Sequence, residues 1–257
     1  MEWERCKNIL IIFFIILNIA LGLLFWYENR KYNITIEQER MIRAIMFQNQ
    51  INMYDSLIRQ HRPMSSLYIG EFSHDGFKDI FFTGNFNTIY DNDMLIMEDN
   101  TGRLTIYESG FIVFDNHSRF NDPLGFINEH FPDFVLDSNI GEWLTFRQVY
   151  NNMIVHSNTI EILVIENNIK QIEIFFGDII GSTGENQEIF SSVLALFSFI
   201  QRARSIFYDT PIIITRMDLV YFQDHMESNL AVPYYRIFIE GNDMPFLVNA
   251  LTNVIMY

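Results

Sequence analysis

The chain has 257 residues, of which 49% are hydrophobic and 19% charged, and its formal net charge is -15. This composition excludes a disordered polymer and predicts one or two globular units with hydrophobic cores. The negative charge repels phosphate backbones and argues against nucleic acid as a partner. The single cysteine, Cys6, excludes an intramolecular disulfide.

The most informative segment is an uncharged apolar run at residues 9–27. Its length is close to the ~20 residues that a membrane-spanning helix needs, and Trp26 and Tyr27 end it where aromatic rings favour the membrane interface. A cleavable signal peptide would have a shorter apolar region followed by small residues, which residues 25–28 do not supply. We therefore expect a short head at residues 1–8 and one transmembrane signal anchor. Basic residues on both sides leave its orientation open.

One carboxamide side chain, Asn18, interrupts the apolar run. Gly22 follows four residues later, so both lie on one helix face, where a small residue admits a second helix and an amide can bond across to it. We predict a partner-helix interface made of Ile11, Ile15, Asn18, Gly22 and Phe25. The alternative is that Asn18 is tolerated in lipid because it bonds its own helix backbone.

After the anchor, the chain predicts two small α+β units with largely antiparallel sheets, at residues 28–138 and 139–257. In the first unit, Thr35 and Gln38 have the spacing of a capping box and predict a helix that ends near residue 48. Two further helices are expected at residues 77–82 and 123–131. The expected strands are residues 51–58, 67–73, 94–98, 103–108 and 111–115.

The second unit follows a boundary that we place within residues 133–144. Apolar residues at helical spacing predict one long helix at residues 187–207. The expected strands are residues 145–155, 160–165, 170–176, 212–222, 234–240 and 246–249. Glu166, Asn167 and Asn168 fit a tight turn with positive φ between two of these strands.

The sequence predicts no catalytic residue, no cofactor site and no metal site. Residues 91–93 begin like a calcium-binding loop, but the glycine and the final glutamate of that motif are missing. The six histidines are scattered, and residues 181–184 lack the lysine of a phosphate-binding loop. We therefore expect a protein that is not an enzyme. A wall-modifying enzyme stays an alternative, which two buried carboxylates facing a cleft ~5–10 Å apart would support.

The start and the end of the chain resemble the YycI family, which comprises membrane regulatory proteins of Gram-positive bacteria. At the start, the resemblance lies in residues 1–7 and in the Leu-Asn and Leu-Gly pairs at 17–18 and 21–22. The closing block is similar to the family's PepSY-like end, at residues 219–221, 232–237 and 247–250.

Residues 148–176 also fit the resemblance, as two strands and a hairpin before a long helix. Two positions depart from the family pattern. Tyr235 stands where tryptophan is usual, and Asn253 stands where glycine is frequent.

The resemblance implies a cytoplasmic amino terminus, a single anchor in the cell membrane and an extracytoplasmic body. It also implies a non-enzymatic regulator that associates with a YycH-like protein and modulates the sensor histidine kinase (YycG/WalK-like) of a cell-wall two-component system. An anchored sensor or binding module for a cell-wall-derived ligand is the alternative, which a sizeable pocket with convergent polar groups would favour. A protease-inhibitor role for the PepSY-like end is a further alternative.

Overall fold

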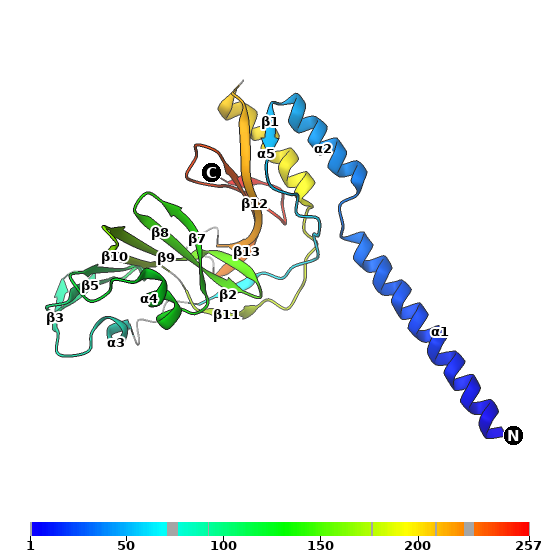
Figure 1. Cartoon of the computed structure of the whole chain (residues 1–257), viewed down its shortest axis with the longest axis horizontal. Helices are drawn as coiled ribbons and strands as arrows, with labels where there is room; N and C mark the ends of the chain where they lie inside the picture. The colour runs from blue at the N-terminus through cyan, green and yellow to red at the C-terminus, as the bar shows by residue number, and fades with distance from the viewer. Residues whose placement is uncertain are drawn as a thin grey trace.

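The computed structural model describes residues 2–70, 77–91, 93–175, 177–208, 210–223 and 229–256. Within these ranges the chain forms an α+β fold whose strands join in one connected, mostly antiparallel sheet. This confirms the α+β class and the largely antiparallel pairing that the sequence predicts. A long helix, α1, projects away from the folded body and carries the amino-terminal end of the chain (Figure 1).

Helix α1 spans Glu2–Lys31. Every side chain from residue 10 to residue 24 is exposed, although almost all of them are apolar. Among the residues whose side chains the structure describes, no helix is both long and apolar enough to cross a membrane. The anchor expected at residues 9–27 therefore stays a prediction.

Helix α2, which spans Ile36–Gln48, begins at the predicted capping box. The Gln38 backbone N–H donates to the Thr35 hydroxyl at 3.2 Å, and the Thr35 N–H donates to the Gln38 side chain at 2.8 Å. These two bonds satisfy amides that the first helical turn leaves without partners. Ile42 and Met46 bury the apolar face of the helix.

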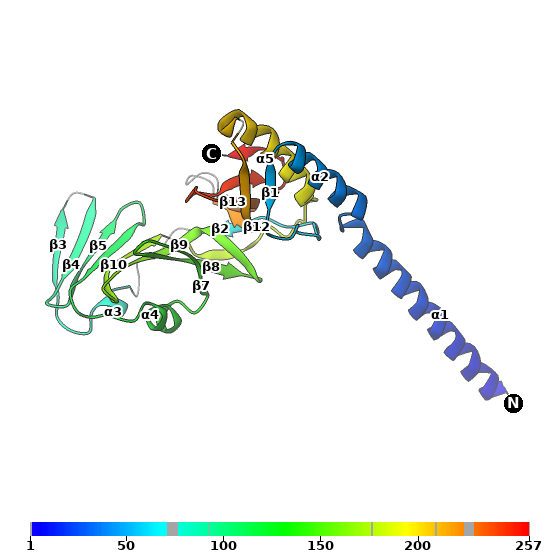
Figure 2. The same ribbon diagram turned by 45° about the horizontal axis from the view of Figure 1, so that its top comes forward.

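The first of two lobes packs α2 and α5 (Ser192–Phe207) side by side against strands from the end of the chain, as Figure 2 shows. Its core joins residues 42–57 to residues 189–250, so the two ends of the body fold together. Its strands are β1 (Ile51–Met53), β12 (Ile212–Phe222), β13 (Leu230–Ile239), β14 (Phe246–Asn249) and β15 (Ile255–Met256).

The second lobe is built from the middle of the chain, and its core between residues 77 and 174 is rich in phenylalanine. Stacked rings such as Phe81 on Phe114, at 4.5 Å between centroids, fill it. Its helices are α3 (Phe77–Phe81) and α4 (Pro123–His130). Its strands are β3 (Asn87–Asp91), β4 (Met94–Glu98), β5 (Gly102–Tyr107), β6 (Ile112–Asn116), β7 (Phe134–Ile140), β8 (Trp143–Tyr150), β9 (Met153–Ile165) and β10 (Asn168–Phe175).

The two lobes meet where β12 pairs with β9 in parallel, through the single register pair Tyr221 and Val155. Nearby, β2 (Leu67–Ile69) pairs with β13 and with β11 (Ile179–Ser182), and a small apolar cluster packs around these strands. The expected unit boundary at residues 133–144 falls inside the β7–β8 hairpin of the second lobe.

Several expected boundaries were wrong for local reasons. The strand expected at 51–58 ends at Met53, and the Asp55 carboxylate accepts the Met217 backbone N–H at 3.2 Å in place of a strand carbonyl. The strand expected at 145–155 is two strands, because Asn151 and Asn152 form a turn with positive φ. The tight turn predicted at Glu166 and Asn167 is confirmed by their φ values of 51° and 61°.

The helix expected at 187–207 begins only at Ser192. Gln187 instead exchanges two backbone hydrogen bonds with Met64, which holds the chain extended there. Of the strand expected at 67–73, β2 covers the first three residues, and residues 71–73 lie outside the described ranges. Strands β3, β7, β11 and β15 were not expected.

Candidate functional site

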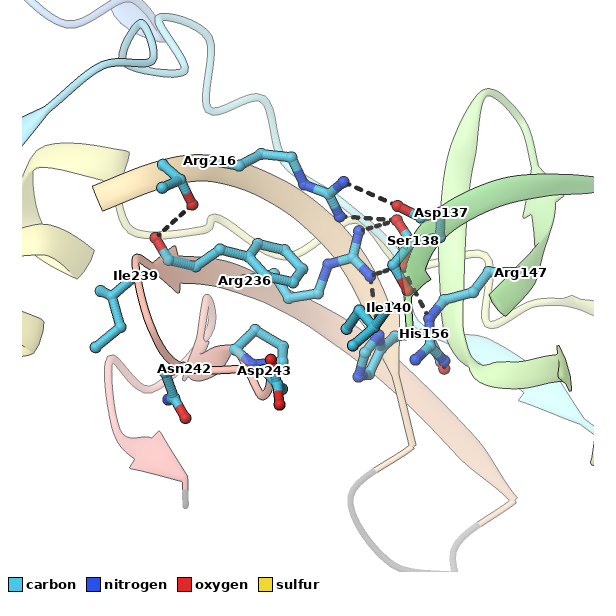
Figure 3. A pocket seen from close by; sticks show the side chains of 13 residues that line it. Asp137, Ser138, Ile140, Arg147, His156, Arg216, Arg236, Ile239, Asn242 and Asp243 are labelled. Atoms are coloured by element: carbon cyan, nitrogen blue, oxygen red, sulfur yellow. Dashed lines mark hydrogen bonds and ion pairs between the residues drawn. The ribbon is translucent and has the colours of Figure 1, made fainter. Parts of the chain in front are cut away.

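A buried carboxylate on β7, that of Asp137, accepts hydrogen bonds from three arginines (Figure 3). Arg147 on β8 donates from Nε at 3.1 Å, and Arg216 on β12 donates from Nη2 at 2.7 Å. Arg236 on β13 donates from both terminal nitrogens, at 2.6 and 2.9 Å. Asp137 thus links two strands of the second lobe to two strands of the first.

Arg236 is the central cation of this cluster, and its side chain is fully buried. It also makes a bidentate pair with Asp218 on β12, at 2.8 and 2.7 Å, and its Nη1 lies 3.1 Å from His156 Nδ1. A guanidinium has five N–H donors, and here all five have acceptors. A buried charge is tolerated when it is paired and hydrogen-bonded in this way.

The protonation states of Asp137 and His156 follow from these neighbours. Burial opposes ionisation of Asp137, but the hydrogen bond and charge of Arg236 and the charge of Arg216 outweigh it and lower its pKa to about 2. Burial, together with the charges of Arg147 and Arg236, lowers the pKa of His156 to about 2. Because arginine only donates, His156 Nδ1 is the acceptor and the ring proton lies on Nε2.

A cavity of about 340 Å³ opens beside the arginine cluster, between β7–β9 of the second lobe and β12, β13 and the β13–β14 turn of the first. Arg216 reaches it from a half-exposed position, and its guanidinium lies 4.2 Å from the centroid of the Phe238 ring. The cavity is lined by Asp137, Ser138, Ile140, Arg147, His156, Thr215, Arg216, Arg236, Phe238, Ile239, Asn242, Asp243 and Pro245.

The ion-paired groups of this site include more guanidiniums than carboxylates, although the charge of Glu161 also acts on Arg147. Three guanidiniums face the two carboxylates that pair with them, Asp137 and Asp218, while His156 is neutral. Asp243 also lines the cavity, from an exposed position on the turn between β13 and β14.

The cavity does not supply the pair of buried carboxylates that the enzyme alternative requires. Asp137 is occupied by three arginines, and Asp243 is exposed. Within the described part of the chain, no group of three or more acidic, histidine or cysteine side chains could hold a metal ion. The arrangement is suited to binding by charge and hydrogen bonding.

The residues predicted from the sequence for a partner-helix interface lie elsewhere, on α1. Ile11, Ile15 and Asn18 are exposed along one face, and a side chain added at Gly22 would meet open space. The Phe25 side chain lies outside the described residues. Asn18 donates from Nδ2 to the Phe14 carbonyl at 2.8 Å, which is the bond that the alternative explanation requires.

The other candidate motifs are accounted for by local structure. Residue 92 of the calcium-like motif lies outside the described residues, and Asp91 ends the exposed strand β3. Gly181 and Ser182, from the glycine-rich segment, belong to strand β11.

Sequence reasoning missed the arginine cluster altogether. Arg236 lies within the closing block at residues 232–237, in the middle of an apolar strand, where a charge must find a buried partner. This position in the sequence indicates a buried ion pair. It does not indicate the partners, because Asp218, His156 and Asp137 lie 18, 80 and 99 residues away along the chain.

The fold and the site together define an α+β body with a polar cavity at the junction of two lobes. No protein-family model matches the chain, and no curated protein matches it either. Among solved structures, the chain is similar in fold to an uncharacterized protein from Eubacterium rectale, with a TM-score of 0.50, 10% sequence identity, and coverage of 80% of this chain and 89% of that one. The C-terminal domain of Bacillus megaterium YpeB also matches, with a TM-score of 0.41, 11% identity, and coverage of 73% of this chain and 98% of that one.

Proposed function

We propose that the chain is a non-enzymatic regulator that is anchored in the cell membrane by α1 and modulates a sensor histidine kinase of a cell-wall two-component system. The observation that carries this proposal is the continuous exposure of apolar side chains from residue 10 to residue 24. Exposed apolar surface on that scale indicates an interaction with lipid or with another protein. The YycI-like start and end of the sequence support a kinase (YycG/WalK-like) and a YycH-like protein as partners.

In this proposal the amino terminus is cytoplasmic and the acidic body is extracytoplasmic. The partner-helix face would be Ile11, Ile15, Asn18, Gly22 and Phe25. The Phe14 bond uses one of the two Asn18 N–H groups, so the second N–H and the oxygen can bond a neighbouring helix. Such a bond contributes about 0.6–2 kcal/mol in a membrane, or roughly a three- to thirtyfold change in association.

The connection between α1 and the body supports the transmission of motion from one to the other. The Ile34 N–H donates to the Arg59 carbonyl at 3.0 Å, and the His61 N–H donates to the Tyr32 carbonyl at 2.9 Å. Helix α2 then begins at the Thr35 cap. Because backbone bonds hold this short segment against residues 59–61, a displacement of α1 would be transmitted to the body. A regulator needs only ~1–3 kcal/mol of difference between two states of its target.

Crosslinking in intact membranes, followed by identification of the crosslinked proteins, tests this function. We expect recovery of a histidine kinase and a weaker yield with Asn18→Leu, which leaves the helix apolar. Ile16→Leu, on the opposite face of α1, is the matched control and should leave the yield unchanged. Recovery of no membrane protein, or equal yields from Asn18→Leu and the parent, would contradict the proposal.

A second candidate function is an anchored sensor or binding module for a cell-wall-derived ligand. The cavity beside Arg216 and Arg236 favours it, because convergent polar groups in a concave site are typical of small-molecule recognition. Binding of soluble wall fragments to the purified chain, and loss of that binding in Arg216→Gln, would distinguish this candidate from a regulator that acts through protein contacts alone.

A further inference from the structure

The three arginines of the cluster differ in how many of their N–H donors are already bonded within the protein. Arg236 uses all five. Arg147 bonds Asp137 through Nε, and through Nη1 it bonds the His156 carbonyl and, at 2.5 Å, the Thr159 hydroxyl. Its Nη2 carries two further N–H groups.

Arg216 is the arginine best placed to meet a ligand. Its side chain is 38% exposed, against 0% for Arg236 and 15% for Arg147. Nη1 donates to the Asp137 backbone carbonyl at 3.2 Å and Nη2 donates to the Asp137 carboxylate at 2.7 Å, so each nitrogen keeps a second N–H. Each of these N–H groups can donate a charge-assisted hydrogen bond to an anionic oxygen.

The walls of the cavity add a second requirement, because part of its lining is apolar. Phe238 lies flat against the Arg216 guanidinium, and Ile140, Ile239 and Pro245 line the same space. A volume of about 340 Å³ is near the lower end of the ~300–1,000 Å³ usual for small-molecule sites. A ligand that fills it is therefore small and has an apolar part next to its charged group.

The free N–H groups of Arg216 select the sign of the ligand, because a positively charged donor attracts an anion. Among the ion-paired groups there is one more guanidinium than carboxylate, and the Glu161 carboxylate also acts on Arg147. The Asp243 carboxylate at the exposed rim disfavours a second negative charge.

We propose that this cavity binds a small monocarboxylate with an apolar body, held by the half-exposed Arg216 guanidinium and packed against Phe238. A carboxylate oxygen accepts from a remaining N–H group on Arg216 Nη1 or Nη2. This site deepens the second candidate function, whose ligand class it specifies. It does not depend on the proposed regulatory function, since binding can be measured without a membrane partner.

Titration calorimetry on the full-length chain in detergent tests the site with two matched pairs of probes. Benzoate is compared with benzamidine, which has the same shape and the opposite charge, and N-acetylalanine is compared with N-acetylalaninamide. We expect the carboxylate of at least one pair to bind saturably and at least tenfold more tightly than its partner. Failure of both carboxylates to saturate up to about 10 mM would overturn the proposal.

Three variants locate the binding. Arg216→Gln should weaken carboxylate affinity at least tenfold, and Asp243→Asn should strengthen it severalfold because it removes the negative rim. Arg103→Gln, on the exposed side of β5 in the second lobe, is the matched control and should change nothing. Equal affinity in Arg216→Gln and the parent would overturn the proposal. If Arg216→Gln fails to fold, the exposed Asp243→Asn decides, since unchanged affinity there would contradict the assigned site. A failed crosslinking experiment would leave these results untouched.

Discussion

Asp137 is the residue that joins the three guanidiniums of the arginine cluster. Its carboxylate is 4% exposed and accepts from Arg147, Arg216 and Arg236. Burying an ion pair yields little net stability, but removing one member leaves the others without compensation. Here the loss of one carboxylate affects three guanidiniums together.

The first prediction therefore concerns Asp137→Asn, which keeps the size of the side chain and removes the charge. We expect the free energy of unfolding to fall by about 3–5 kcal/mol in urea titrations. The parent's advantage should shrink by about 2 kcal/mol in acid. The folded-state pKa of Asp137 is lowered from 3.8 to about 2, so its contribution is present above pH 3.8 and lost as the pH falls through 2.

Asp115→Asn is the matched control for charge removal. Its carboxylate, with that of Glu161, helps raise the pKa of Glu173, whose burial is the larger cause. Removing Asp115 should therefore leave stability unchanged or increase it. An equal loss of stability in both variants would show that the arginines around Asp137 are not responsible.

The second prediction concerns His156, which is held neutral. An unfolded chain binds a proton at this residue near pH 6.5, whereas the folded chain does so only near 2, so acid favours unfolding between these values. Stability should fall by about 1.4 kcal/mol per pH unit below 6.5 on account of this residue. His156→Gln should lose that part of the pH dependence.

Proton NMR provides the direct check on His156. Its ring resonances should not titrate between pH 7 and pH 5 in the folded chain. His117→Gln, which alters an exposed residue, is the control for replacing a histidine by glutamine. A His156 ring that titrates near 6.5 would contradict the packing described here.

At the scale of elements, the third prediction tests the start of α2. Thr35→Ala removes the hydroxyl that accepts from the Gln38 N–H, so we expect a loss of about 1 kcal/mol in the free energy of unfolding. Thr35→Ser, which restores a hydroxyl, should recover most of it. If alanine and serine at this position are equally stable, the capping box contributes nothing to the stability of the body.

Local signals predicted some elements well, and the reasons are visible in particular residues. Thr35 and Gln38 marked a helix start, and Glu166 and Asn167 marked a turn, because each feature depends on residues close in sequence. Strands β3 and β7 were missed because they carry many exposed side chains and little alternation. Their place is decided by pairing with neighbouring strands, which a local pattern does not contain.

The candidate site was less predictable than the elements. Arg147, Arg216 and Arg236 stand on three strands, and only their pairing with one aspartate on a fourth makes them a cluster. A charged residue in an apolar strand indicates that a partner of opposite charge is needed, but it does not identify that partner. Long-range topology was therefore the missing information.

At the scale of the whole molecule, two hydrophobic cores are joined by a narrow interface. One core joins the two ends of the body, and the other lies between residues 77 and 174. The backbone ladder between β9 and β12 has only one register pair, so side chains carry much of the connection. Asp137 and Arg236 are the buried pair that crosses it.

The fourth prediction follows from this arrangement. In the parent chain, hydrogen exchange measured at rising urea should show α5, in the first core, and β10, in the second, losing protection together. Arg236→Met replaces the crossing guanidinium by an apolar side chain of similar length. It should separate the two losses, because each lobe keeps its own core while the charged connection between them is gone.

Asp243→Asn is the control, since it alters an exposed residue of the same cavity and leaves the crossing pair intact. Loss of protection in α5 and β10 at one urea concentration in Arg236→Met would mean that the sheet and the small apolar cluster around Leu67 and Val155 suffice to couple the lobes. Separate losses already in the parent would mean that the lobes are independent and that the cavity between them can change shape. If the two lobes lose protection together in the parent and separately in Arg236→Met, the arginine cluster is what connects them. A ligand bound at Arg216 could then change the relation between the two lobes through this cluster.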